Sequence, residues 1–133
     1  MSATVLLIED SKFIRIASQR ELIKAGYSVL MASDGENGLR MARENMPDLI
    51  LLDMMLPIIA GADVLRSLKA DKQTAGIPVI ILSSLSQKSS IKLSRGDIAG
   101  YIEKSALVSG DAQVIVKALQ AATEHQALQG TRL

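Results

Sequence analysis

Three carboxylates directly follow apolar segments of this sequence. Glu9 and Asp10 come after the apolar run 5–8, and Asp53 comes after the run 49–52. A carboxylate at the end of a buried segment is costly unless a partner compensates its charge. If the segments lie side by side, the three acids converge, and their mutual repulsion requires a cation. Mg²⁺ takes oxygen ligands and needs only one or two carboxylates, so these residues predict a magnesium site.

A lysine and a pair of hydroxyls follow two further apolar segments. Ser83 and Ser84 come after 79–82, and Lys104 follows the weaker segment 99–102. The lysine adds a positive charge and a hydroxyl adds a hydrogen-bond donor, and both groups suit the oxygens of a phosphoryl group. Together with the acids and a metal ion, they predict a site that binds phosphoryl groups.

The apolar segments have the length and composition of β-strands. Each is short, continuous and bounded by polar or turn residues, which is typical of strands buried on both faces of a parallel sheet. The expected strands are 5–8, 28–32, 49–52, 79–82 and 99–102. Segments of helical period separate them. The expected helices are 11–25, 35–45, 61–71, 85–95 and 111–123.

Strand and helix therefore alternate five times. This order predicts an α/β fold, a doubly wound five-stranded parallel sheet with five helices on its two faces. Ligands of such sheets bind at the carboxyl ends of the strands, where the acids, the hydroxyls and the lysine stand. We expect one domain, 1–133, with a core of about 4–123 and a polar C-terminal tail, 124–133.

The bulk composition excludes several classes of protein. The chain has 48% hydrophobic and 22% charged residues, as in an ordinary globular protein. It has no cysteine, which excludes disulfide frameworks and thiolate zinc sites and fits a cytoplasmic protein. A net charge of +1 and few aromatic residues argue against nucleic-acid binding. The N-terminus has neither the basic region of a signal peptide nor the length of a membrane span.

Each candidate residue also has an ordinary structural explanation. Asp53 could cap a turn, and Asp10 precedes "SKF" and could be the N-cap of the helix 11–25. Lys104 could be a solvated surface lysine. Ser83 and Ser84 could begin a helix, and spacing alone favours Ser83 as the hydroxyl of the site.

Taken in order, these residues resemble those of the CheY-like receiver domains of response regulators in two-component signal transduction. The resemblance covers about 4–123. No single motif is specific, but the ordered set, with each motif at a predicted strand end, is very specific. The motifs are "IED" at 8–10, "DGENGL" at 34–39, "PDLILLD" at 47–53, "LLDMMLPIIAG" at 51–61, "PVIILSS" at 78–84 and "GYIEK" at 100–104.

The resemblance implies a role for each acid. Asp53 would be the phosphoacceptor and would form an acyl phosphate. Asp10 and Asp53 would ligate Mg²⁺, and Glu9 would act through a bound water. The backbone carbonyl of Met55 would be a further ligand.

The resemblance also implies roles for three residues of the last two strands. Lys104 would pair with the phosphoryl oxygens, and Ser83 would hydrogen-bond one of them. Tyr101 would turn inward when Ser83 shifts. The conformational signal would then reach the face built from 85–95, 99–102 and 111–123.

One segment departs from the family's pattern. Ser105 follows Lys104, where the family usually has proline. The stretch "SALVSGD" at 105–111 also looks like a longer loop than usual before the last helix. We therefore expect a long loop after Lys104, whose geometry the family pattern does not fix.

The resemblance implies protein partners. A histidine kinase or a histidine phosphotransfer protein would donate the phosphoryl group, and a downstream protein effector would receive the signal. Nucleic acid and membrane are not expected partners, and a homodimer stays open. Ile14, near Asp10, is the expected contact for the phosphodonor, and the basic residues Lys88, Lys92 and Arg95 are candidates for a partner surface.

The first helix carries a second apolar cluster. Phe13, Ile16 and Ile23 lie off its main apolar stripe. We expect them to belong to the core in a rotated helix, and otherwise to form a docking surface.

The leading interpretation is a stand-alone receiver that catalyses only its own phosphorylation and dephosphorylation. The alternative is a pseudo-receiver, which uses the same fold as a phosphorylation-independent interaction module. A phosphatase with an aspartyl nucleophile is disfavoured because Met55 stands where such enzymes have an acid. A dinucleotide-binding enzyme is disfavoured because no G-x-G-x-x-G follows 5–8.

Overall fold

The predicted alternation of strands and helices is confirmed in a computed structural model, which describes residues 3–84, 98–109 and 117–122. The strands are β1 (Thr4–Ile8), β2 (Ser28–Ala32), β3 (Leu49–Asp53), β4 (Val79–Ser83) and β5 (Gly100–Glu103). The helices are α1 (Lys12–Lys24), α2 (Gly35–Asn45), α3 (Gly61–Ala70) and α4 (Lys104–Ser109). Residues 117–122 are also helical. No helix among these residues is long and apolar enough to cross a membrane.

The five strands form one parallel sheet in the order β2-β1-β3-β4-β5. Every residue of β3 and β4 is buried, whereas the edge strands β2 and β5 are only partly covered. This burial explains why the central strands have continuous apolar sequences rather than alternating ones. The order is that of a doubly wound, flavodoxin-like sheet, as predicted.

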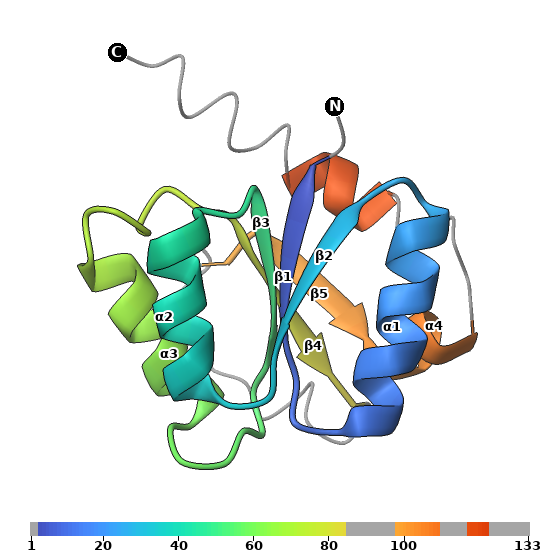
Figure 1. Ribbon diagram of the computed structural model, residues 1–133, viewed down its shortest axis with the longest axis horizontal. Helices are drawn as coiled ribbons and strands as arrows, with labels where there is room; N and C mark the ends of the chain where they lie inside the picture. Colours follow the sequence, from blue (N-terminus) through green and yellow to red (C-terminus); the bar gives the residue numbers. More distant parts are fainter. Residues whose placement is uncertain (1–2, 85–97, 110–116, 123–133) are drawn as a thin grey trace.

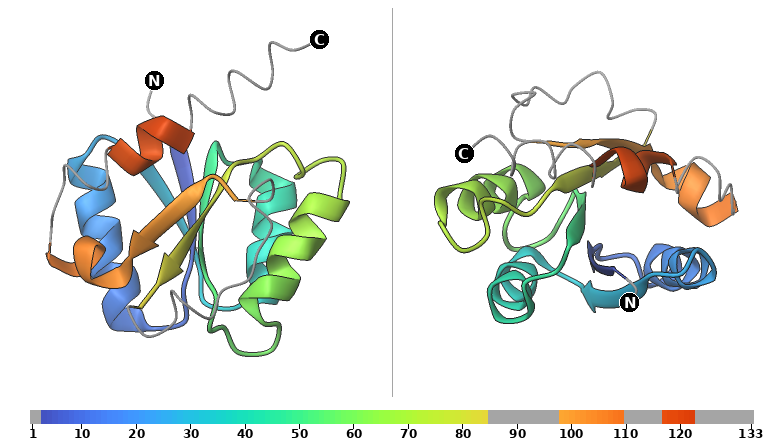
Figure 2. Two further views of the ribbon diagram at one scale, coloured as in Figure 1. Left: turned by 180° about the vertical axis from the view of Figure 1, so that it is seen from behind. Right: turned by 90° about the horizontal axis from the view of Figure 1, so that it is seen from above.

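Helices cover both faces of the sheet (Figure 1). Because side chains alternate along each strand, Leu51 and Ile80 pack in one core cluster and Leu52 and Ile81 pack in another. The first cluster includes Leu22 of α1, and the second faces α2 and α3. Figure 2 shows the sheet between the two layers of helices.

Side-chain caps start the first two helices. Ser11 is the N-cap of α1 and accepts a hydrogen bond from the backbone N–H of Ile14 at 3.3 Å. Asp34 accepts a hydrogen bond from the backbone N–H of Asn37 at 2.8 Å at the start of α2. The ordinary explanation of Asp10 as the N-cap is therefore wrong, because a hydroxyl one residue later takes that role.

The expectation of a long loop after Lys104 is wrong for the first residues of that segment. Residues Lys104–Ser109 form α4, and Leu107 is fully buried in the core cluster that contains Leu22. Burial of this leucine fixes a helix that its serine-rich sequence does not favour. The predicted helix 85–95, and residues 111–116 and 123 of the predicted helix 111–123, lie outside the described residues.

The second apolar cluster of α1 is on the surface and not in the core. Phe13, Ile16 and Ile23 are 71%, 43% and 55% exposed. The inward face of α1 is instead occupied by Ser18 and Leu22, both fully buried. The expectation that these residues belong to the core is therefore wrong, and a docking role for this exposed cluster stays a prediction.

Candidate functional site

The sheet order brings the first acids and Asp53 together. The strand order reverses direction between the neighbouring strands β1 and β3, which is the topological switch point of the sheet. Ligands of such sheets bind at this switch point. Glu9 directly follows β1, and Asp53 is the last residue of β3. Both side chains are completely buried. The carboxyl ends of these strands meet at the lower edge of the sheet in Figure 1.

Asp53 has one engaged and one unengaged oxygen. Its Oδ1 accepts a hydrogen bond from the backbone N–H of Met55 at 3.0 Å and lies 3.0 Å from Nζ of Lys104. Its Oδ2 is buried and accepts no hydrogen bond from any residue that the structure describes. A buried carboxylate oxygen without a partner is rare and costly, so this atom points to a ligand that the site is built to receive.

Lys104 lies between two buried acids. Its Nζ is 3.0 Å from Asp53 and 3.2 Å from Oε1 of Glu9, and its side chain is 18% exposed. Burial acts to lower the pKa of Lys104, but the hydrogen bond and charge of Asp53, together with Glu9, outweigh burial and raise it. Lys104 is therefore a permanent cation of the site and not a surface lysine.

The carboxylate of Glu9 is not fully compensated by positive charge. Its Oε2 accepts from the N–H of Ser11 at 3.2 Å. Burial, followed by the close approach of the Asp53 carboxylate and the repulsion from it, raises the pKa of Glu9 from 4.5 to about 7. The N–H of Ser11 and the charge of Lys104 oppose this shift without cancelling it. One lysine does not neutralise the acids around it.

Asp10 completes an acidic cluster. One carboxylate oxygen from each of Glu9, Asp10 and Asp53 lies within 4.8 Å of the others. Asp10 is exposed, and because Ser11 caps α1, its carboxylate is not engaged as the helix cap. The excess of negative charge, the unpartnered Asp53 oxygen and the all-oxygen donor set fit a hard divalent cation such as Mg²⁺.

The raised pKa of Glu9 predicts that the metal-free protein loses stability as the pH rises. The folded state keeps this proton up to about pH 7, whereas the unfolded chain releases it near 4.5. Stability is therefore lost between these values, by about 3 kcal/mol at most. Urea unfolding in EDTA at pH 5 and pH 8 measures the change. The isosteric variant Glu9→Gln should flatten the pH dependence, and an equal dependence in both proteins would contradict the assignment.

Ser83 and Tyr101 are placed at the neighbouring strand ends. Ser83 is the last residue of β4 and is buried, and its Oγ has no hydrogen-bond partner. Tyr101 pairs with Ile81 across β4 and β5 and is 41% exposed. The roles of Ser83 as a phosphoryl ligand, of Tyr101 as a switch and of the Met55 carbonyl as a metal ligand stay predictions.

The expected docking residues divide into two groups. Ile14 is half-buried on α1. Next to it, exposed residues of α1 and one residue of α4 line a pocket of about 470 Å³. The lining residues are Lys12, Phe13, Ile16, Ala17, Arg20 and Val108. Lys88, Lys92 and Arg95 lie outside the described residues.

Arg15 shapes the site, although no pattern in the sequence singles it out. A single guanidinium nitrogen of Arg15 donates hydrogen bonds to the backbone carbonyls of Glu9 and Asp10, at 3.0 Å each. These bonds fix the turn that presents both acids. The only signal in the sequence is an arginine in the first turns of a helix that follows an acidic pair, and that signal is too common to be specific.

Comparisons with known proteins agree with this geometry. The family profile described as the response regulator receiver domain matches residues 5–120. The chain is 35% identical over 106 residues to the polar-differentiation response regulator DivK of Brucella ovis, covering 78% of this chain and 85% of DivK. It is 43% identical over 81 residues to the transcriptional regulatory protein AfsQ1 of Streptomyces coelicolor, covering 61% of this chain but only 35% of AfsQ1.

A solved structure shares the whole fold. The response regulator receiver domain protein from Clostridium thermocellum superposes with a TM-score of 0.80 at 30% identity, and the match covers 96% of this chain and 98% of that one. The profile match, the DivK relative and this structure point to one family, and the solved structure has the fold described above. The chain therefore belongs to the response regulator receiver domain family of two-component signalling.

Proposed function

We propose that this receiver domain accepts a phosphoryl group on Asp53 in a Mg²⁺-dependent reaction. One observation carries the proposal: Asp53 is fully buried, with Oδ1 held by Lys104 and the Met55 N–H, while Oδ2 has no hydrogen-bond partner. A structural aspartate would have both oxygens satisfied, whereas a nucleophile needs a free one.

The chemistry follows from this arrangement. An oxygen of Asp53 attacks phosphorus, and a new P–O bond forms to the carboxylate. The bond from phosphorus to the imidazole nitrogen of a donor phosphohistidine breaks, and its electron pair passes to that nitrogen. Lys104 stays beside the acceptor and stabilises the negative charge of the phosphoryl oxygens. The hydroxyl of Ser83, which is buried without a partner, is a donor for one of those oxygens.

A magnesium ion would be held by Glu9, Asp10 and Asp53, with the carbonyl of Met55 as a further ligand. When bound, it supplies the positive charge that the acids lack. Glu9 must then give up the proton that its raised pKa lets it keep near neutral pH. The chain's own contribution is to keep the three carboxylates within 4.8 Å of one another.

The proposed partners are a histidine kinase or histidine phosphotransfer protein as donor and a protein effector as recipient. The pocket between α1 and α4 supports a donor contact on this side of the site, because Phe13 and Ile16 are exposed there. The signal is a shift between two existing conformations of the face that includes β5 and Tyr101. Action as a stand-alone cytoplasmic chain stays a prediction from the sequence.

Intact mass after incubation with acetyl phosphate tests the proposal. We expect one phosphoryl group to be added to the wild type in the presence of Mg²⁺, and none in EDTA or in Asp53→Asn. Asp63→Asn is the matched control, since Asp63 is an exposed aspartate of α3, and it should be phosphorylated like the wild type. If the wild type takes up no phosphoryl group and binds no Mg²⁺, the pseudo-receiver alternative replaces this function.

A further inference from the structure

The loop after the phosphoacceptor contains an unusual turn. The backbone N–H of Ile59 donates to the carbonyl of Pro57 at 2.8 Å, which closes a three-residue γ-turn around Ile58. Ile58 has a φ of +71°, in the left-handed region. This conformation is a genuine outlier for a β-branched residue, whereas glycine adopts it without strain. The backbone conformation at position 58 therefore favours glycine, although the sequence has isoleucine there.

Packing of the Ile58 side chain does not explain its presence. Ile58 is 76% exposed, although the next residue, Ile59, packs against the core cluster of α2 and α3. The ring of Pro57 fixes one side of the turn, and Gly61 lies against the backbone of Met54 on the other. The loop path is thus set by its neighbours, and Ile58 adds only strain and exposed apolar surface within the described structure.

The position of this surface indicates what covers it. Met55, which is 63% exposed, belongs to the same loop, and its N–H binds the carboxylate of Asp53. Any molecule that delivers a phosphoryl group to Asp53 must approach the carboxyl edge of the sheet beside this loop. Strained residues that their surroundings hold in place cluster at functional sites, where the strain serves binding.

We propose that Ile58, with Met55, contacts an apolar side chain of the protein phosphodonor next to its phosphohistidine and so selects the donor. This inference rests on the proposed function of Asp53. Contact with an apolar neighbour removes the exposed surface of Ile58 from water, and a polar neighbour cannot replace that gain. A small phosphodonor such as acetyl phosphate has no side chain to offer, so Ile58 does not affect its reaction.

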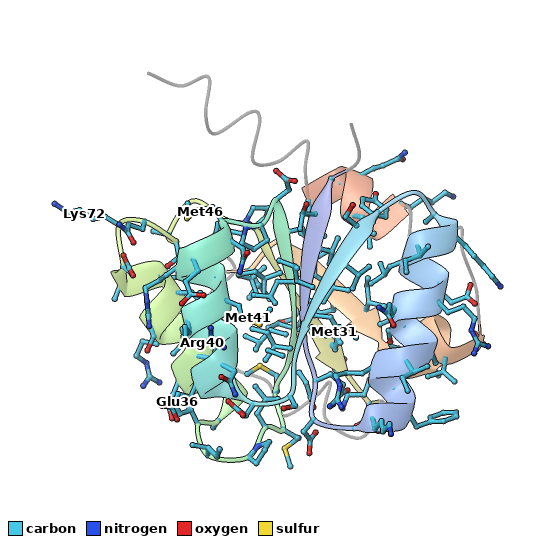
Figure 3. All side chains as sticks on the ribbon, viewed as in Figure 1. Met31, Glu36, Arg40, Met41, Met46 and Lys72 are labelled. Carbon is cyan, nitrogen blue, oxygen red and sulfur yellow. The ribbon has the colours of Figure 1, made fainter. Side chains whose placement is uncertain are left out.

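The structure offers a matched control for the strain. Met46 is also apolar, half exposed at 51% and left-handed, with a φ of +46°. It caps the C-terminal end of α2, at the opposite end of that helix from the Asp53 edge (Figure 3). Met46→Gly and Ile58→Gly both relieve a left-handed residue, and only the second removes the proposed donor contact.

Two synthetic phosphohistidine peptides test the proposal, identical except for leucine or serine beside the phosphohistidine. Initial rates of phosphoryl addition are measured by intact mass, with acetyl phosphate as a third donor. We expect the wild type to prefer the leucine peptide by about tenfold, within the range that burial of one aliphatic side chain supports. Ile58→Gly should abolish this preference, so that both peptides react at about the same rate. Ile58→Val should keep most of the preference, and Met46→Gly should leave it unchanged.

Each contrary result has a distinct meaning. No preference in the wild type, or an unchanged preference in Ile58→Gly, overturns the proposal. An equal loss of rate with acetyl phosphate in Ile58→Gly also overturns it, because Ile58 would then only shape the loop around Asp53. If acetyl phosphate phosphorylates neither the wild type nor any variant, the proposed function of Asp53 is wrong, and the inference about Ile58 is wrong as well.

Discussion

Replacing Lys104 by methionine is expected to lower the free energy of unfolding of the metal-free protein by about 3 to 5 kcal/mol at pH 8. Methionine keeps most of the buried stem of the side chain but removes the only cation that, among the described residues, pairs with the carboxylates of Asp53 and Glu9. Two fully buried carboxylates would then face each other without compensation. At pH 5 the loss should be smaller, because Glu9 is protonated there and only one charge remains.

Urea unfolding in EDTA at both pH values measures this effect. Lys72→Met is the control, since Lys72 is an exposed lysine that lies far from the acidic cluster (Figure 3), and it should change stability by less than about 0.5 kcal/mol. Added Mg²⁺ should restore part of the stability of Lys104→Met, because it binds only the folded acidic cluster. A small, pH-independent loss would show that Lys104 does not hold the two acids.

Gly61→Ala is expected to destabilise the protein by about 3 kcal/mol and to slow phosphoryl addition. A Cβ at position 61 would overlap Cα of Met54 and lie 2.5 Å from the backbone carbonyl of Asp53. Both neighbours are backbone atoms, which cannot rotate away as the end of a side chain can. The loop that follows Asp53 must therefore move, and Asp53 moves with it.

Thermal unfolding and the initial rate with acetyl phosphate report the two effects separately. Gly100→Ala is the matched control, because a Cβ at Gly100 would meet nothing within 4 Å. It should leave both quantities close to those of the wild type. Equal stability of Gly61→Ala and Gly100→Ala would mean that the Asp53 loop has room that its packing does not indicate.

The strands were predictable because a strand that is buried on both faces of the sheet has a continuous run of apolar residues in its sequence. Leu51 and Leu52 point to opposite core clusters, so the run 49–52 must be apolar at every position. The acidic site was predictable for a related reason. Residues that follow parallel strands meet at one edge, so the order of the chain alone brings Glu9 and Asp53 together.

The predictions were wrong at positions where tertiary packing, and not the local sequence, determines burial or backbone conformation. On α1, Ser18 is buried while Phe13 is exposed, so hydrophobicity alone assigns the wrong face to this helix. Leu107 holds α4 in helical form by its burial, which a serine-rich sequence does not reveal. The left-handed turn at Ile58 was equally hidden, because an apolar residue there gives no turn signal.

The place of Asp53 in the sheet has a consequence for how information leaves this domain. Asp53 ends β3, the middle strand of five, and the preceding residues of that strand alternate between the two core clusters. An acceptor on β2 or β5 would border the rim of the molecule. An acceptor on β3 is mechanically connected to both helical layers at once. Under the proposed function, phosphorylation of Asp53 can thus affect two separate surfaces, so that a protein that supplies the phosphoryl group and a protein that responds to it need not compete for one face.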